Sequence, residues 1–232
     1  MYKWPSETAA FCGGLWERLA GTSGVDVVIC PPYTSLAEAV RPFDRTDVAV
    51  YAQNVHWAEE GAFTGEISTR MLLDLGVDGS LVGHSERRQH FGESDETVAR
   101  RTVAALEAGL RVIACVGESE EEREAGQTEL VLRVQVETLA DAVGAHEHLA
   151  VAYEPVWAIG TGKTATPEQA QEAHAFIRSL LDVPLLYGGS VKPENADELL
   201  AQPDVDGALV GGASLDVESF AAICEAAARI RS

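Results

Sequence analysis

Along almost the whole of this 232-residue chain, a short apolar run is followed by an amphipathic stretch with the pattern of a helix. The apolar runs are rich in β-branched residues and apolar on both faces, which is typical of parallel strands covered by helices on both sides. The runs occupy residues 25–30, 48–53, 80–84, 111–117, 149–154, 184–189 and 206–212. The helical stretches occupy residues 5–20, 34–41, 68–75, 94–108, 119–143, 167–182, 194–201 and 216–230. This strict alternation predicts a parallel α/β fold that forms a single domain over residues 1–232.

The two kinds of segment differ in number, because eight helices accompany seven strands and the chain opens with a helix. Eight strand–helix units would close into a (β/α)8 barrel, also called a TIM barrel. We therefore expect a TIM barrel that lacks most or all of its first β-strand. A doubly wound open sheet is the alternative, but no GxGxxG motif opens a first strand–helix unit.

The charge of the chain excludes two classes of partner. With 37 acidic and 17 basic residues, the net charge is −20. Such a surface repels nucleic acid and anionic membranes, so we expect neither as a partner. Any phosphate site must then be built locally, from backbone N–H groups and helix N-termini.

Two further features of the sequence bear on its location and on metal binding. Neither a membrane-spanning apolar run nor a secretory signal is present, so we expect a cytoplasmic protein. The four cysteines are widely spaced and form no CxxC pair, which favours reduced thiols over a disulfide framework or a metal site.

Residues 153–166, with the sequence YEPVWAIGTGKTAT, combine an acidic side chain with a segment suited to move. Glu154 ends an apolar run, Pro155 follows it, and a glycine-rich stretch comes after three apolar residues. This pattern indicates a carboxylate at the tip of a strand, next to a hinged lid that closes and expels water. The alternative is a surface loop with one buried tryptophan.

Other residues that could take part in catalysis or binding also lie at strand ends, where the active site of a parallel barrel is formed. His84 precedes Ser-Glu-Arg-Arg, a plausible helix start, and the positive end of that helix would keep its imidazole neutral. A structural histidine is the alternative. Two glycine-rich turns, at 188–190 and 211–212, follow the last two strands and allow backbone N–H groups to approach an anion closely. These turns predict a phosphate site.

Taken together, these motifs resemble those of the triosephosphate isomerase family, in order and in spacing, over essentially the whole chain. The motifs are VGHSERR (82–88), CVGE (115–118), AYEPVWAIGTGK (152–163), YGGSV (187–191) and LVGGASL (209–215), together with the segment 54–68 that contains GAFTGEIS. The resemblance implies an isomerase of glycolysis and gluconeogenesis that interconverts dihydroxyacetone phosphate and glyceraldehyde 3-phosphate without a metal or an organic cofactor. Glu154 would be the general base that moves a proton between adjacent carbons, and His84 the neutral electrophile, the pairing for which this family is known.

The resemblance also implies roles for residues around this pair. Gly160 in the lid, Ser190, Gly211 and Gly212 would bind the phosphate of the substrate. Ser85, Glu86, Cys115 and Thr64 would support the site, and Glu118 would belong to a network on the lid side. The loop 61–67 would enter a neighbouring subunit and place Thr64 near its active site, so a homodimer is expected. A free surface loop is the alternative.

The chain departs from the family pattern at its beginning. The family's first strand ends in Asn-Trp-Lys-Met, whose Asn and Lys contact substrate, whereas Met1 aligns directly after that Lys. Glu86 would then be a buried carboxylate without its cationic partner, which is costly. We consider two explanations. The start of the protein lies upstream of Met1, or the chain is short and forms a catalytically weak or silent barrel that binds phosphate or a partner.

Overall fold

The computed structural model describes residues 1–43, 46–159 and 164–231. At its centre lies one parallel sheet in which the strands follow chain order, from β1 to β7. The strands are β1 Val27–Ile29, β2 Val48–Ala52, β3 Gly79–Val82, β4 Arg111–Val116, β5 Leu149–Tyr153, β6 Leu185–Tyr187 and β7 Gly207–Ala208. Each overlaps one of the predicted apolar runs, which confirms the parallel α/β class.

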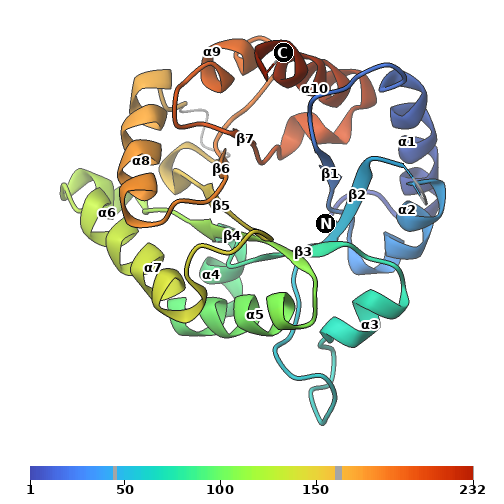
Figure 1. Cartoon of the computed structure of the whole chain (residues 1–232), viewed down its shortest axis with the longest axis horizontal. Helices are drawn as coiled ribbons and strands as arrows, with labels where there is room; N and C mark the ends of the chain where they lie inside the picture. The colour runs from blue at the N-terminus through green and yellow to red at the C-terminus, as the bar shows by residue number, and fades with distance from the viewer. Residues whose placement is uncertain (44–45, 160–163, 232) are drawn as a thin grey trace.

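The sheet curls around a central space, and the helices lie outside it (Figure 1). They are α1 Pro5–Arg18, α2 Leu36–Phe43, α3 Thr69–Asp74, α4 Ser85–Phe91, α5 Asp95–Glu107, α6 Glu120–Glu124, α7 Thr128–Val143, α8 Pro167–Leu180, α9 Ala196–Leu200 and α10 Val217–Arg231. Short 3-10 helices cover η1 Tyr33–Ser35, η2 Val156–Ala158 and η3 Gly212–Leu215. Within the described ranges, none of these helices has the length and apolar character needed to cross a membrane.

Two helix predictions were incomplete. The single helix expected at 119–143 is divided into α6 and α7, because Gly126 between them has a left-handed backbone with φ +68°. The helix α4 directly follows His84 and ends at Gly92, whose φ is +68°. The sequence indicated only the start of α4.

Side chains alternate between the two faces of the sheet, as the period of a strand requires. Inside the curl, Tyr51, Leu81, Ile113 and Ala152 from β2 to β5 pack together with the thiol of Cys115. The opposite faces of the same strands contribute to a larger core against the helices. Because both faces of the sheet are buried, every position of a strand is apolar, and the strands appear in the sequence as continuous hydrophobic runs.

The strands β1 and β7 are the two ends of the sheet, and within the described residues no strand pairs with their outer edges. Outside them, however, α1 and α10 pack against each other. Arg18 of α1 bridges Glu218 at 2.9 Å and Glu225 at 3.4 Å, both on α10. The helical layer is therefore continuous across this position, whereas the sheet is not.

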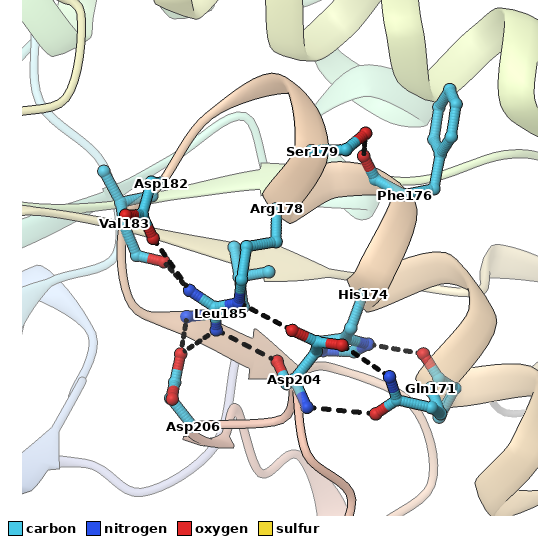
Figure 2. Close-up of polar contacts among 11 residues, drawn as sticks. Gln171, His174, Phe176, Arg178, Ser179, Asp182, Val183, Leu185, Asp204 and Asp206 are labelled. Carbon is cyan, nitrogen blue, oxygen red and sulfur yellow. Dashed lines mark hydrogen bonds and ion pairs between the residues drawn. The ribbon is translucent and has the colours of Figure 1, made fainter.

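The guanidinium of Arg178 on α8 ties the beginnings of the last two strands together (Figure 2). Its Nε donates to Asp204 at 2.9 Å, and its Nη2 pairs with Asp206, which directly precedes β7. The same carboxylate of Asp206 accepts the backbone N–H of Leu185 in β6 at 2.9 Å. This network fixes the strands that carry the two glycine-rich turns.

Candidate active site

Glu154 lies directly after β5, and its carboxylate is held at the start of α4. Its side chain is almost completely buried, with 2 % of the residue surface exposed. Oε2 accepts the backbone N–H of Ser85 at 2.8 Å, and Oε1 accepts the hydroxyl of Ser85 at 3.0 Å. Both carboxylate oxygens are thus engaged in the structure, and a reacting group would have to replace these bonds.

His84 caps the N-terminus of α4 and faces Glu154. Its Nδ1 accepts the backbone N–H of Glu86 at 3.3 Å, which assigns the ring proton of a neutral imidazole to Nε2. Nε2 lies 3.2 Å from Oε1 of Glu154. The imidazole can therefore donate a hydrogen bond from Nε2, either to this carboxylate or to a carbonyl oxygen placed beside it.

Burial is the main influence on the protonation of Glu154. Removal from water raises the pKa of its carboxyl group above the ordinary value, while His84 and the bonds from Ser85 act in the opposite direction. The buried thiol of Cys115 lies beside it on β4, and its own pKa is raised by burial and by the carboxylate. A carboxylate with a raised pKa is a stronger base, which suits it to accept a proton from carbon.

Two glycines, Gly117 and Gly188, lie so close to Glu154 that a side chain at either position would collide with it or with its neighbour. A Cβ on Gly117, after β4, would lie 1.8 Å from the backbone oxygen of Glu154. A Cβ on Gly188, after β6, would lie 2.9 Å from Cγ of Glu154 and 3.1 Å from the oxygen of Tyr153. Any larger residue at 117 would displace the backbone, so this strand end accepts only glycine.

The pair His84 and Glu154 opens onto a cavity of about 1740 Å³. The glycine-rich turns line the same cavity, with Ser190 on one and Gly211 and Gly212 on the other. Added Cβ atoms at Gly211 or Gly212 would meet nothing within 4 Å, so their backbone faces open space. The structure thus brings the predicted catalytic pair and these three predicted phosphate ligands to one cavity.

Comparison with known proteins agrees with this arrangement. The family model described as triosephosphate isomerase matches residues 1–227. The chain is 53 % identical to the triosephosphate isomerase of Carboxydothermus hydrogenoformans, over 96 % of this chain and 94 % of the relative. It is 53 % identical to that of Xanthomonas campestris pv. campestris, with 95 % and 94 % covered, and 52 % identical to that of Solibacter usitatus, with 96 % and 94 % covered.

The chain belongs to the triosephosphate isomerase family. It is accordingly an enzyme of the isomerase class, and its function is the triose-phosphate isomerisation of glycolysis. The curled parallel sheet with outer helices is the α/β architecture of this TIM-barrel family.

The supporting residues predicted for a triosephosphate isomerase lie in different environments. Ser85 and Cys115 touch the carboxylate of Glu154, as described above. Thr64 is exposed on the loop that extends away from the barrel between β2 and α3 (Figure 1). Gly160 lies outside the described residues, so only residues 155–159 of the predicted lid are described before the gap.

The prediction that Glu86 is buried was wrong. Glu86 is exposed and lines the cavity. Because the space beside it is open to solvent, its carboxylate stays hydrated and the cost of an isolated buried charge does not arise.

The lid-side residues of this isomerase meet at one carboxylate, that of Glu118, which is fully buried. Its Oε1 accepts hydrogen bonds from Trp157 Nε1 at 2.9 Å, Tyr153 hydroxyl at 3.1 Å and Arg123 Nη1 at 3.1 Å. The guanidinium of Arg123 also lies over the ring of Trp157, 4.3 Å from its centre. The network predicted around Glu118 therefore joins η2, β5 and α6.

Replacement of Trp157 by phenylalanine should lower the free energy of unfolding by about 1–3 kcal/mol, because a fully buried carboxylate loses a donor. Urea denaturation of the purified chain measures this. Trp16→Phe is the matched control, since Trp16 is 49 % exposed on α1. Equal losses in both variants would contradict the role given to the indole N–H.

One positioning residue carried no predicted role although its motif was noticed. Arg88 of α4 donates from Nε to the backbone oxygen of Gly83 at 2.9 Å and from Nη2 to that of Cys115 at 3.2 Å. Its Nη1 pairs with Asp95 at 2.6 Å. Arg88 thereby ties the ends of β3 and β4 together, close to His84. Its position four residues after His84, on the next turn of a helix, was the available signal.

Proposed function

We propose that this enzyme interconverts dihydroxyacetone phosphate and glyceraldehyde 3-phosphate through an enediolate, with Glu154 as the base and His84 as the electrophile. The observation that carries the proposal is the contact between the two side chains, 3.2 Å apart from Nε2 of His84 to Oε1 of Glu154, in the lining of the cavity. Glu154 would take a proton from one carbon and return it to the next. Nε2 of His84 would hydrogen-bond to the carbonyl oxygen and stabilise the negative charge that develops there.

Binding of the substrate must first free the carboxylate from Ser85. The lid residues Pro155 and η2 follow Glu154 directly in the chain, so a movement of the lid would carry the base with it. In this proposal Gly160, Ser190, Gly211 and Gly212 hold the phosphate through the backbone and the hydroxyl. Closure excludes water, which protects the enediolate from loss of phosphate.

The wider architecture is part of the same proposal. The seven strands would be seven positions of a (β/α)8 barrel, and the eighth position, of the first strand, would lie between β7 and β1. This is supported by the continuous contact of α1 and α10 outside that position. The loop 61–67, with Phe63 46 % exposed, would pack into a second copy and form a homodimer in the cytoplasm.

The pH dependence of the reaction tests the assignment of the base. We expect kcat/KM for glyceraldehyde 3-phosphate to rise with pH, with a midpoint above the ordinary pKa of a glutamate, because burial raises the pKa of Glu154. Ser85→Ala removes a hydrogen bond that favours the ionised carboxylate, and should move the midpoint upward by about one pH unit.

Initial rates between pH 4 and pH 8, with the stability of each variant checked at each pH, measure this effect. Ser179→Ala is the matched control, because its hydroxyl donates to the backbone oxygen of Phe176 in its own helix. A midpoint that is unchanged or lower in Ser85→Ala would count against Glu154 as the base.

A further inference from the structure

The side chain of Gln135 on α7 holds the backbone of Gly117, the residue that directly follows β4. Its Oε1 accepts the backbone N–H of Gly117 at 2.7 Å, and its Nε2 donates to the backbone oxygen of the same residue at 3.2 Å. One amide group thus satisfies both polar backbone groups of one residue, as a neighbouring strand would. We call this pair of hydrogen bonds the Gln135 clamp.

The Gln135 clamp lies where the pairing of β4 and β5 ends. The last residues paired between these strands are Val116 and Tyr153. One residue further along β5, the backbone N–H of Glu154 donates to the oxygen of Val116 at 2.7 Å. The clamp therefore supports the main chain of β4 for one residue beyond the ladder, beside the residue that carries the carboxylate.

The main chains of Gly117 and Glu154 are in direct contact. A Cβ on Gly117 would lie 1.8 Å from the backbone oxygen of Glu154 and 3.3 Å from its Cα. A movement of Gly117 toward Glu154 is blocked by this contact, and a movement away would leave a gap in a packed region. The place of Gly117 therefore limits where the main chain of Glu154 can lie.

On its other side, Glu154 is supported by the sheet itself. The backbone N–H of Gly188, after β6, donates to the oxygen of Tyr153 at 2.7 Å. A Cβ on Gly188 would lie 2.9 Å from Cγ of Glu154. The support from Gly117 differs because it depends on a side chain, that of Gln135, and can be removed by one substitution.

The clamp is anchored in the buried face of a helix. Leu132, Val136 and Leu139 of α7 are at most 2 % exposed and belong to the core between the sheet and the helices. Gln135 lies three residues after Leu132 and four before Leu139, so it shares their face of the helix. The helix α7 lies outside the sheet and contacts β4 (Figure 1). This packing restricts the movement of the amide group.

We propose that Gln135 is a positioning residue for the isomerisation, which holds Gly117 and thereby keeps Glu154 in place beside Ser85 and His84. The inference rests on the assignment of Glu154 as the base. The carboxylate of Glu154 lies 2.8 Å from the backbone nitrogen of Ser85 and 3.2 Å from Nε2 of His84. Reacting groups must meet with similar accuracy, because a misplacement of about 1 Å can cost about 10²-fold in rate.

The position of Glu154 can be measured without turnover. Gln135→Met keeps the approximate size of the side chain and removes both hydrogen bonds to Gly117. The backbone N–H of Ser85 donates to Oε2 of Glu154, so it reports whether the carboxylate has moved. In this variant we expect that N–H to exchange with deuterium at least about tenfold faster, as for a weakened hydrogen bond.

Two further variants complete this measurement. Gln135→Glu keeps an acceptor for the Gly117 N–H but loses the donor to its oxygen, so it should change the exchange of Ser85 in the same direction. Gln171→Met on α8 is the matched control. Gln171 also makes two bonds with one residue, since it donates to the carboxylate of Asp204 and accepts its backbone N–H at 3.0 Å. This control should leave the exchange of Ser85 unchanged.

Kinetics test whether Gln135 acts through the base. Gln135→Met should lower kcat for glyceraldehyde 3-phosphate by about 10–100-fold, with little change of KM, because the turns 188–190 and 211–212 are untouched. A partly misfolded preparation would give the same loss of kcat. The substitution is therefore repeated in the Glu154→Gln background, where it should have little further effect on the residual rate.

The outcomes separate this inference from the assignment of the base. Unchanged exchange of the Ser85 N–H in Gln135→Met would overturn the inference and leave the base in place. An equal fold loss of rate with and without the Glu154 carboxylate would do the same. Substantial activity of Glu154→Gln alone would instead refute the assignment of the base, and the role of Gln135 with it.

Discussion

Replacement of Glu154 by glutamine is expected to lower kcat for glyceraldehyde 3-phosphate by about 10³-fold, within the range for loss of a positioned general base. Glutamine has the same size and can still accept the backbone N–H of Ser85 through its oxygen and donate to the Ser85 hydroxyl through its NH2 group, so the site should keep its shape. It cannot accept a proton from carbon. KM should change little, since the phosphate contacts proposed at Ser190, Gly211 and Gly212 are untouched. Steady-state kinetics in both directions measure the split between kcat and KM.

The stability of this variant provides a control with a definite sign. Burial raises the pKa of Glu154 in the folded state, so the folded form binds more protons than the unfolded form between the two pKa values. The stabilisation from this group is present at acid pH and is lost as pH rises through the folded pKa. Near pH 7 the buried, ionised carboxylate therefore lowers the stability of the folded state. The variant Glu154→Gln should melt at the same temperature as the unaltered chain or at a higher one.

The matched substitution is Glu172→Gln on the exposed side of α8, which should leave kcat unchanged. An active Glu154→Gln would require a different base. An inactive variant that melts well below the unaltered chain would show misfolding instead of lost proton transfer, and would not support the assignment.

An extension of the chain at its N-terminus should have the second-largest effect. If an apolar strand ending in Asn-Trp-Lys is fused ahead of Met1, we expect kcat/KM to rise by about 10²–10³-fold, the usual worth of one preorganised electrostatic contact. The added lysine would enter a cavity whose carboxylates include Glu86 and Glu154, in a chain of net charge −20. A fixed cation there would attract the phosphorylated substrate and stabilise the enediolate.

Two fusions separate packing from charge. One carries the full segment, and the other carries methionine in place of the lysine. Both should raise the melting temperature, because both would place an apolar strand between the sheet edges at β1 and β7, but only the first should raise kcat/KM. If the first fusion folds and gains no activity, the proposed place of the strand is wrong, and a catalytically weak or silent barrel becomes the better account.

Much of the fold was predictable because parallel strands that are buried on both faces leave a simple signal. Runs such as VAVYA at β2 and LAVAY at β5 are apolar throughout, and each is a strand. The helix boundary at Gly126 was missed because the flanking residues keep a helical pattern on both sides. The break between α6 and α7 covers residues 125–127, where Gly126 has a left-handed backbone.

The sequence predicted which residues form the site better than it predicted the contacts between them. Glu154 and His84 stand at strand ends, and the parallel topology brings such ends together. The sequence did not show that both oxygens of Glu154 bond to Ser85, nor that Glu86 is exposed. Those features depend on side-chain directions and on the open space beside them, which local patterns do not encode.

The hub at Glu118 has a consequence for how this sequence can vary. One buried carboxylate serves Tyr153, Trp157 and Arg123 together. A change at any one of these positions leaves the others poorly satisfied, so their mutational effects should not add. We infer strong epistasis within this quartet. We therefore expect related sequences either to keep all four residues or to replace several of them together.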